Sequence, residues 1–254
     1  MTTIAVAQDA LTHWHQALAV ATGGKIFTTH GCSWVWQPVR KRLLLLFPDN
    51  PEAAGLRPAL AEGRRLGARR VEAWLNSGAS AAQLLDAGFT DNAQVSWHAG
   101  LLAIPHEQWK GKIRLGTNVP EASGADAKEL EVTNLWRNQE TGLRSGHPAL
   151  RRIEHAAART EDNEIVGRGF VQQGLTGQLM VHSLAVSPSH RRQGVGTALL
   201  HGLSRSMINP LNPLDDTEPQ ELLAAATPRS AEFFSANGLR LLGRGRHLVL
   251  RSWN

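Results

Sequence analysis

The stretch that decides the fold runs from Leu179 to Leu203 and reads LMVHSLAVSPSHRRQGVGTALLHGL. Its apolar start predicts a strand over residues 177–186, and the Ser, Pro and His residues that follow predict a turn over residues 187–192. From residue 194 to about residue 207, apolar side chains recur every three or four positions. This spacing predicts an amphipathic helix with one buried face.

The start of that helix has the features of an anion-binding site. The first backbone N–H groups of a helix lack intrahelical partners, and the helix dipole adds partial positive charge there. Gly194 and Gly196 remove side chains that would keep a phosphate away from the backbone, while Arg191 and Arg192 can add charge-assisted hydrogen bonds. Taken alone, the two glycines suit a nucleotide-binding turn and an ordinary tight strand-to-helix turn as well.

The full string resembles the signature of the GNAT acyltransferase superfamily, whose helix-opening loop reads Arg or Gln, two residues, Gly, one residue, Gly or Ala. Arg191, Gly194 and Gly196 meet this pattern. The flanking matches are Leu184-Ala185-Val186, Pro188, Phe233-Phe234 and Asn237-Gly238-Leu239. The resemblance implies an α/β fold with a mixed, mostly antiparallel sheet that is splayed open at its middle and flanked by helices.

The resemblance also implies that the domain binds an acyl-CoA, most simply acetyl-CoA, in the gap of the sheet. The backbone of residues 184–186 would pair with the pantetheine amides as an added strand would, and the amides of residues 192–197 would hold the diphosphate. The residues assigned to acetyl-CoA are Leu184, Ala185, Val186, Arg191, Arg192, Gln193, Gly194, Val195, Gly196 and Thr197.

His182 is the candidate catalytic base. Amine attack on a thioester needs a neutral amine and a group that receives a proton. Many relatives carry a glutamate at the position that His182 occupies here, four residues before Val186. An imidazole with an ordinary pKa of ~6.5 could act at neutral pH, but a buried, hydrogen-bonded strand histidine explains the residue equally well. Strand alternation predicts that His182, Leu184 and Val186 share one face.

The proton donor to the departing thiolate is not evident. Family members often use a tyrosine on the late helix, but this chain has no tyrosine, and Phe234 stands at the matching position. Either a thiol with a pKa of ~8.5 leaves without assistance, or water, Thr227 or Ser230 donates the proton. The third alternative is a slow or degenerate domain.

A weak internal repeat predicts that both halves share one order of elements. The matching segments are residues 41–48 with 181–188 and residues 71–89 with 221–239. In the N-terminal half, Pro51–Leu56 stands opposite the glycine-containing loop and has lost its arginine and both key glycines. We therefore predict two tandem copies of one fold, a degenerate GNAT-like domain over residues 1–110 and a catalytic domain over residues 111–254.

Periodicity and turn residues predict the other elements. Predicted strands lie over residues 43–47, near residue 113, and over residues 154–160, 164–173, 221–226 and 246–251; predicted helices lie over residues 125–138, 147–152 and 228–236. The loop of residues 139–147 borders the acceptor pocket in relatives, so that Glu140 and Arg144 could select a charged acceptor. A solvent-exposed loop explains them as well.

Composition narrows the class of protein. The net charge of +5 is spread, with 10 basic and 8 acidic residues before residue 111, which argues against a nucleic-acid partner. No apolar run reaches the ~18 residues of a membrane span. The single cysteine excludes an intrachain disulfide and favours the cytoplasm. No metal is predicted, because His13, His15, His30 and Cys32 lack the spacing of a zinc site.

These observations favour an N-acetyltransferase that moves an acetyl group from acetyl-CoA to a primary amine of a small-molecule or peptide acceptor by direct attack. The absence of tyrosine motivates an alternative, a non-catalytic sensor or scaffold that binds acyl-CoA. A basic protein that associates with nucleic acid is the third hypothesis, because the isoelectric point is near 10.1. The sequence leaves the oligomeric state open, with a homodimer as one option.

Overall fold

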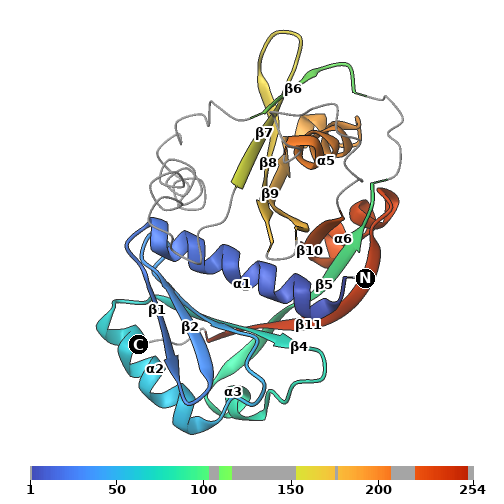
Figure 1. Cartoon of the computed structure of the whole chain (residues 1–254). Helices are drawn as coiled ribbons and strands as arrows, with labels where there is room; N and C mark the ends of the chain where they lie inside the picture. The colour runs from blue at the N-terminus through green and yellow to red at the C-terminus, as the bar shows by residue number, and fades with distance from the viewer. Residues whose placement is uncertain (1, 103–108, 116–152, 175–176, 207–220, 251–254) are drawn as a thin grey trace. The chain divides into compact units, whose positions relative to one another are not determined.

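The computed structural model describes residues 2–102, 109–115, 153–174, 177–206 and 221–250. These residues form two compact units (Figure 1). The N unit contains residues 11–96 and 243–250, and the C unit contains residues 2–10, 97–102, 109–115, 153–174, 177–206 and 221–242. None of the described helices is long and apolar enough to cross a membrane.

The N unit is built on a mixed sheet with the strand order β1-β2-β3-β4-β11-β5. The strands are β1 (Lys25–Thr29), β2 (Cys32–Gln37), β3 (Arg42–Leu46), β4 (Arg70–Asn76), β11 (Arg240–Leu250) and β5 (Phe89–Gly100), of which the last two belong to this unit only in part. Antiparallel pairs join β1 to β2, β2 to β3 and β4 to β11, whereas β3 and β4 are parallel. The helices are α2 (Ala53–Arg65), α3 (Ala82–Asp86) and the larger part of α1 (Ile4–Ala21).

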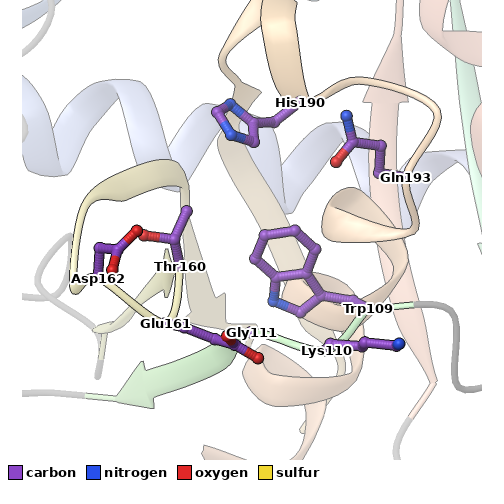
Figure 2. Close-up of a pocket in the computed structure, with 8 residues that line it drawn as sticks. All are labelled: Trp109, Lys110, Gly111, Thr160, Glu161, Asp162, His190 and Gln193. Atoms are coloured by element: carbon purple, nitrogen blue, oxygen red, sulfur yellow. The ribbon is translucent and has the colours of Figure 1, made fainter.

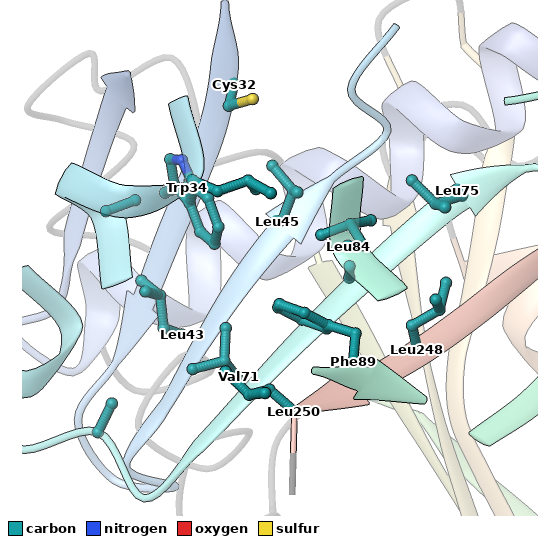
Figure 3. Packing of buried hydrophobic residues seen from close by; sticks show 14 of the residues in the cluster. Cys32, Trp34, Leu43, Leu45, Val71, Leu75, Leu84, Phe89, Leu248 and Leu250 are labelled. Carbon is teal, nitrogen blue, oxygen red and sulfur yellow. The ribbon is translucent and has the colours of Figure 1, made fainter. Parts of the chain in front are cut away.

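The core of the N unit is apolar on the sheet face that meets α2 and α3. Trp34, Leu43 and Phe89 are fully buried there, together with Leu84 from α3 (Figure 3). The predicted apolar strand at residues 43–47 is confirmed as β3, and its central side chains alternate between this core and a second cluster on the other face. Burial on both faces explains why its apolar run is continuous.

The C unit has the strand order β5-β10-β9-β8-β7-β6. Its own strands are β6 (Lys112–Leu115), β7 (Ile153–Arg159), β8 (Ile165–Gln173), β9 (Leu179–Val186) and β10 (Leu222–Ala226). A short 3₁₀ turn over Pro188–His190 leads to α5 (Val195–Ser206), and α6 (Pro228–Ala236) follows β10. The predicted buried face of α5 is confirmed, because Val195, Leu199 and Leu203 lie in the core of this unit.

Two long strands divide their length between the units. Residues 89–96 of β5 belong to the N unit and residues 97–100 to the C unit, while β11 enters the N unit at Gly243. Within the N unit, β11 pairs with β4 from Gly245–Asn76 to Leu250–Val71. The final strand of the C-terminal half therefore completes the sheet of the N-terminal half.

Polar side-chain contacts hold β11 in the N unit. His247 Nε2 lies 3.0 Å from Glu72 Oε2, and Arg246 makes a bidentate pair with Asp91 at 3.0 and 2.7 Å. Burial alone would raise the pKa of Glu72, but its hydrogen bond with His247 and the charges of Arg42, His247 and Arg70 lower that pKa to about 2. Glu72 is thus ionised over the whole physiological range.

The predicted repeat is visible in the order of elements in both units. The segment β3, α2, β4, α3 is followed by Gly88 at φ 92°, and the segment β9, α5, β10, α6 is followed by Gly238 at φ 90°. The division into two domains at residue 110 stays a prediction, because a compact unit defined by packing is not the same thing as a repeat defined by sequence.

One predicted boundary is wrong. The last strand is predicted over residues 246–251, but β11 begins at Arg240. The predicted start is too late because Gly243 and Gly245 interrupt the apolar pattern in the first half of the strand. The other predicted strands of the C-terminal half agree with β6 to β10 to within two residues, and α6 agrees at both ends. The helices predicted over residues 125–138 and 147–152, and the loop with Glu140 and Arg144, lie outside the described residues.

Candidate functional site

A β-bulge interrupts β9 at Ser183. On β8, Phe170 stands opposite His182 and Arg168 opposite Ala185, so that three steps along β9 match two steps along β8. The extra residue coincides with a left-handed backbone at Ser183, φ 51°. A bulge of this kind bends the strand and re-aims the side chains that follow it.

The bulge overturns the predicted alternation along this strand. Leu184 and Val186 pack against the same core cluster as Val181, on the side of α5, and His182 is not part of that cluster. A Cβ atom on Gly169 would lie 2.8 Å from Leu184 Cδ1 and 3.0 Å from Leu203 Cδ1, which places Leu184 beneath α5. His182 therefore does not share a face with Leu184 and Val186, because the inserted residue shifts the alternation by one.

Beyond the bulge, β9 separates from β10. The parallel ladder between the two strands ends at the pair Val181–Ala224, whereas β9 stays paired with β8 as far as Val186. From residue 183 to residue 186 the side chains are no longer fully buried, and Ala185 is exposed. Residues 183–186 thus lie beyond the end of the β9–β10 ladder, where an added strand or a strand-like ligand can pair, although Val186 O already accepts from Arg191 Nε.

The β9–α5 loop (residues 187–194) is shaped by two left-handed residues, Arg192 at φ 63° and Gly194 at φ 81°. The first backbone bond of the helix runs from Ala198 N–H to Gly194 O at 3.0 Å. The amides of residues 195–197 precede this bond, and they point outward from the start of the helix. The loop thus presents backbone donors next to the open edge of β9.

Two side chains of the loop brace it. Arg191 Nε donates to Val186 O at 3.2 Å, and Gln193 Nε2 donates to Ser189 O at 3.1 Å. Arg191 therefore ties the loop to the end of β9, and the exposed Arg192 is the more available cation. Val195 is buried in the core, so its backbone alone can serve the site.

Gly196 has a packing role that the sequence did not reveal. A Cβ atom at this position would lie 3.0 Å from Phe233 Cε2 and 3.1 Å from Phe233 Cζ. The missing side chain therefore lets the first turn of α5 meet the ring of Phe233 on α6. Gly194, with its positive φ, is the glycine that the loop conformation itself requires.

His182 lies in a row of side chains on the sheet face away from α5. On β8, Phe170 stands opposite His182. On its other side Phe170 stands opposite His155 of β7, and the ring centroids of His155 and Phe170 lie 4.7 Å apart. Burial lowers the pKa of His182 well below 6.5 and lowers that of His155 to about 4. Both imidazoles are therefore neutral at pH 7. A neutral His182 can accept a proton, but only as a weak base.

The position of the missing tyrosine is apolar. Phe234 is only 6% exposed, and its ring meets that of Phe233 edge-on at 5.2 Å and that of His98 at 6.2 Å. Thr227 and Ser230 form a capping box at the start of α6, with Thr227 N–H donating to Ser230 Oγ at 3.1 Å. Both hydroxyl groups are thus engaged at the helix cap, and their role as proton donors stays a prediction.

A pocket adjoins the β9–α5 loop and was missed in the sequence. It is lined by Trp109, Lys110, Gly111, Thr160, Glu161, Asp162, His190 and Gln193 (Figure 2). The last two belong to the loop, and the others come from segments far away in sequence. Nothing in the spacing of these residues relates them, so only the fold brings them together.

The counterpart in the N unit is closed. β3 and β4 are paired along all of β3, from Arg42–Arg70 to Leu46–Trp74, and Phe47 N–H extends the ladder by donating to Trp74 O at 2.9 Å. At the start of α2, a Cβ atom on Gly55 would lie 2.9 Å from Thr29 O and 3.0 Å from Cys32 Sγ. This helix start therefore packs on neighbouring strands and offers no cradle for a phosphate.

The described residues contain no cluster of three or more His, Cys, Asp or Glu side chains that could hold a metal ion. Cys32 is buried in the N unit, and burial raises the pKa of its thiol. His13, His15 and His30 therefore provide no metal site with Cys32 in the part of the chain that the structure describes.

Comparison with protein families matches residues 153–238 to the acetyltransferase (GNAT) domain. No curated protein sequence matches the chain at a significant level. The matched segment contains β7 to α6 and thus the bulge, the open edge of β9 and the β9–α5 loop.

Solved structures share the fold over nearly the whole chain. A GCN5-related N-acetyltransferase from Kribbella flavida superposes with a TM-score of 0.58 at 17% identity, covering 95% of each chain. A tandem GNAT protein from the clavulanic acid biosynthesis pathway gives 0.53 at 15% identity, covering 94% of each. A functionally unknown conserved protein from Staphylococcus epidermidis gives 0.58 at 10% identity, covering 90% of this chain and 94% of the other. At these identities the likeness establishes the fold, which confirms the predicted mixed, mostly antiparallel sheet flanked by helices and fits the predicted tandem arrangement.

Proposed function

We propose that this chain, whose residues 153–238 belong to the GNAT acetyltransferase family, transfers an acetyl group from acetyl-CoA to the primary amine of a small-molecule or peptide acceptor. One observation carries the proposal: the edge of β9 opens at Val181–Ala224 and leads directly to the outward-pointing amides at the start of α5. An acyl-CoA needs both features, because its pantetheine arm carries amides and its diphosphate carries negative charge.

The edge of β9 and the start of α5 can together hold such an acyl donor. The backbone of Leu184 to Val186, apart from Val186 O, which accepts from Arg191 Nε, can exchange hydrogen bonds with the pantetheine amides. The amides of residues 195–197, together with Arg192 and the positive end of the helix dipole, can hold the diphosphate.

In the proposed reaction the acceptor nitrogen attacks the thioester carbonyl carbon, a C–N bond forms and the C–S bond breaks. The nitrogen loses one proton and the departing thiolate gains one, so that no net proton is released. His182 is the proposed group that accepts the proton of the attacking amine. Because burial lowers its pKa well below 6.5, His182 is suited to an amine that arrives uncharged, and it cannot deprotonate a strongly basic ammonium group efficiently.

The second candidate function is a sensor that binds acyl-CoA without turnover, and Phe234 is the observation that favours it. A phenyl ring cannot protonate a thiolate, and it occupies the position at which relatives carry tyrosine. A thiol with a pKa of ~8.5 is a tolerable leaving group without assistance, so the ring slows the reaction without forbidding it.

The test is thiol release from acetyl-CoA by the purified full-length chain, measured with a panel of primary amines, alongside calorimetry with CoA. Binding of CoA with amine-dependent thiol release supports the enzyme. Binding without release for any amine of the panel supports the sensor. If the chain takes up no CoA, both candidate functions fail.

A further inference from the structure

The pocket beside the β9–α5 loop has a volume of about 400 Å³ and no role in the chemistry described above. Its walls come from Trp109–Gly111 ahead of β6, from Thr160–Asp162 between β7 and β8, and from His190 and Gln193. Figure 2 shows the indole of Trp109 in the middle of this lining, with His190 and Gln193 above it and Thr160 and Asp162 across from it. All of these residues belong to the C unit.

The two polar walls are held in place by hydrogen bonds. In the β7–β8 turn, Thr160 N–H donates to Glu164 O at 3.0 Å, and Thr160 Oγ1 accepts from Glu164 N–H at 3.1 Å. On the other side, Gln193 is fixed to Ser189 O, and Ser189 Oγ lies 3.0 Å from His190 Nδ1. The pocket is therefore formed before any ligand arrives, which reduces the entropy cost of binding.

Trp109 supplies the apolar wall. Its indole lies over Gly111, where a Cβ atom would overlap the ring, and it packs against the core of the C unit. Its Nε1 atom is buried and has no hydrogen-bond partner among the described residues. The pocket thus offers the aromatic surface of the indole, while the indole N–H is buried away from it.

The polar lining suits a purine base better than a phosphate. The carboxylates of Glu161 and Asp162 accept hydrogen bonds and repel phosphate, and they outnumber the single ammonium group of Lys110. Adenine offers a flat ring for stacking and an exocyclic amine that donates to a carboxylate.

We propose that this pocket binds the adenosine end of the acyl-CoA, with the adenine base stacked on Trp109 and its exocyclic amine directed to the carboxylates of the β7–β8 turn. The inference rests on the proposed function, because the diphosphate at the start of α5 brings the nucleoside to this side of the loop. Gln193 belongs both to the loop and to the pocket, and it joins the two subsites. The phosphates stay outside, near Arg192.

The first test is calorimetry of the full-length chain with adenosine 3′,5′-bisphosphate and with CoA. Trp109→Leu should weaken the binding of the bisphosphate about tenfold, because the base loses the aromatic surface on which it stacks. The preference for CoA over pantetheine should shrink by the same factor, because pantetheine lacks the base. CoA should displace the bisphosphate competitively.

The second test uses exposed residues, so that it remains informative if Trp109→Leu does not fold. The double variant Glu161→Gln, Asp162→Asn should lose the preference for CoA over 1,N6-etheno-CoA, whose exocyclic amine is blocked. Glu164→Gln is the matched control, because Glu164 lies in the same turn but does not line the pocket. The control should retain the wild-type preference.

The inference is overturned if Trp109→Leu folds and binds CoA and the bisphosphate as the wild type does; the proposed function then still stands. It is also overturned if the bisphosphate binds without displacement by CoA, or if a polyamine occupies the pocket in a Trp109-dependent way and the bisphosphate does not. If the wild type binds neither CoA nor the bisphosphate, it is the proposed function that fails.

Discussion

The pair β3–β4 in the N unit and the pair β9–β10 in the C unit are both parallel and both precede a helix, but only one of them opens. β3 is paired with β4 along its whole length, while β9 leaves β10 after Val181. The difference has two local sources in the C unit, the bulge at Ser183 and the glycine-containing loop before α5. Neither Lys41 nor Phe47, the left-handed residues that flank β3, interrupts its pairing with β4.

This contrast shows that the order of elements does not create the site. Both units have the strand–helix–strand–helix order, and both have a glycine within or beside the first turn of the first helix. In the N unit, Gly55 allows close packing against Thr29 and Cys32. In the C unit, Gly194 allows a turn that leaves three amides free of the helix. A ligand site therefore depends on what the glycine approaches.

Transplanting the closed loop of the N unit into the C unit should have the largest effect. Replacing residues 191–196, RRQGVG, with residues 51–56, PEAAGL, removes both glycines and both arginines and adds a carboxylate. We expect CoA affinity to fall about 100-fold or more, because several charge-assisted and backbone hydrogen bonds are lost together. Calorimetry with CoA measures this, and a melting curve shows whether the chimera is folded. A folded chimera with wild-type affinity would contradict the assignment of the loop.

Mild acid should destabilise the C unit more than the N unit. Because the folded-state pKa of His155 is lowered from 6.5 to about 4, the unfolded chain binds more protons between these values, and stability falls as pH drops from 6.5 toward 4. The expected loss is about 3 kcal/mol. Glu72 behaves differently, since its pKa of about 2 preserves its contribution until the pH falls below 4.5.

Hydrogen exchange at pH 7 and pH 5 tests this difference. Protection in β7 to β9 should decrease at pH 5, and protection in β3 and β4 should be retained. His155→Asn removes the titrating group and should flatten the pH dependence of the C unit. An equal loss of protection in both units would show that the buried histidines do not govern acid stability.

The variant His182→Gln tests the proposed base, which directly precedes the bulge. The variant keeps a polar side chain but removes the proton acceptor, so kcat should fall by about 10- to 100-fold while the KM for acetyl-CoA changes little. In the wild type, the lowered pKa keeps the imidazole in its basic form down to well below pH 6.5. The acid limb of kcat should therefore follow the acceptor amine and not an enzyme group near pH 6.5. Unchanged kcat in the variant would exclude His182 as the base.

Gly194→Val tests the loop conformation with a control in the N unit. Gly194 has φ 81°, and Gly67 has φ 75° with open space around its Cβ position, so valine strains both backbones by a similar amount, about 1–2 kcal/mol. Only Gly194→Val should raise the KM for acetyl-CoA, by about tenfold, because only there does the distortion move amides of the site. Equal effects on KM would assign the change to general destabilisation.

The smallest expected effect is that of Gly196→Ala. Its Cβ would meet the ring of Phe233 at 3.0 Å, and a modest movement of this partly buried ring can relieve the contact. We expect a rise of about threefold in the KM for acetyl-CoA and recovery in the double variant with Phe233→Leu, as coupled neighbours predict. Steady-state kinetics of the four proteins gives the coupling. Additive effects would mean that Gly196 acts independently of Phe233.

The sequence predicted the elements of the C unit well where a period was unbroken. The helical spacing of α5 and the cap residues of α6 located both helices, and the loop signature located the helix start. The bulge at Ser183 was not predictable, because alternation assumes one residue per step and nothing in LMVHSLAV marks an insertion. The prediction that His182, Leu184 and Val186 share a face was wrong for this reason.

Contacts between residues far apart in the chain were the second feature that the sequence could not predict. Trp109, Thr160 and His190 meet in one pocket although about 30 or more residues separate each from the next, and sequence periodicity carries no information at such separations. The start of β11 at Arg240 was not predicted from the sequence because Gly243 and Gly245 interrupt its apolar pattern. The role of His182 as the base and the roles of residues 184–186 and 191–197 in binding acetyl-CoA stay predictions.

The placement of β11 has a consequence for biosynthesis. Because residues 243–250 form a strand of the sheet that begins at residue 25, the N-terminal half cannot complete its hydrogen-bonded ladder until residue 250 has left the ribosome. Until then the edge of β4 is exposed and prone to pair with other chains. A nascent chain arrested before residue 240 should therefore recruit chaperones, and release of the last strand should end that dependence.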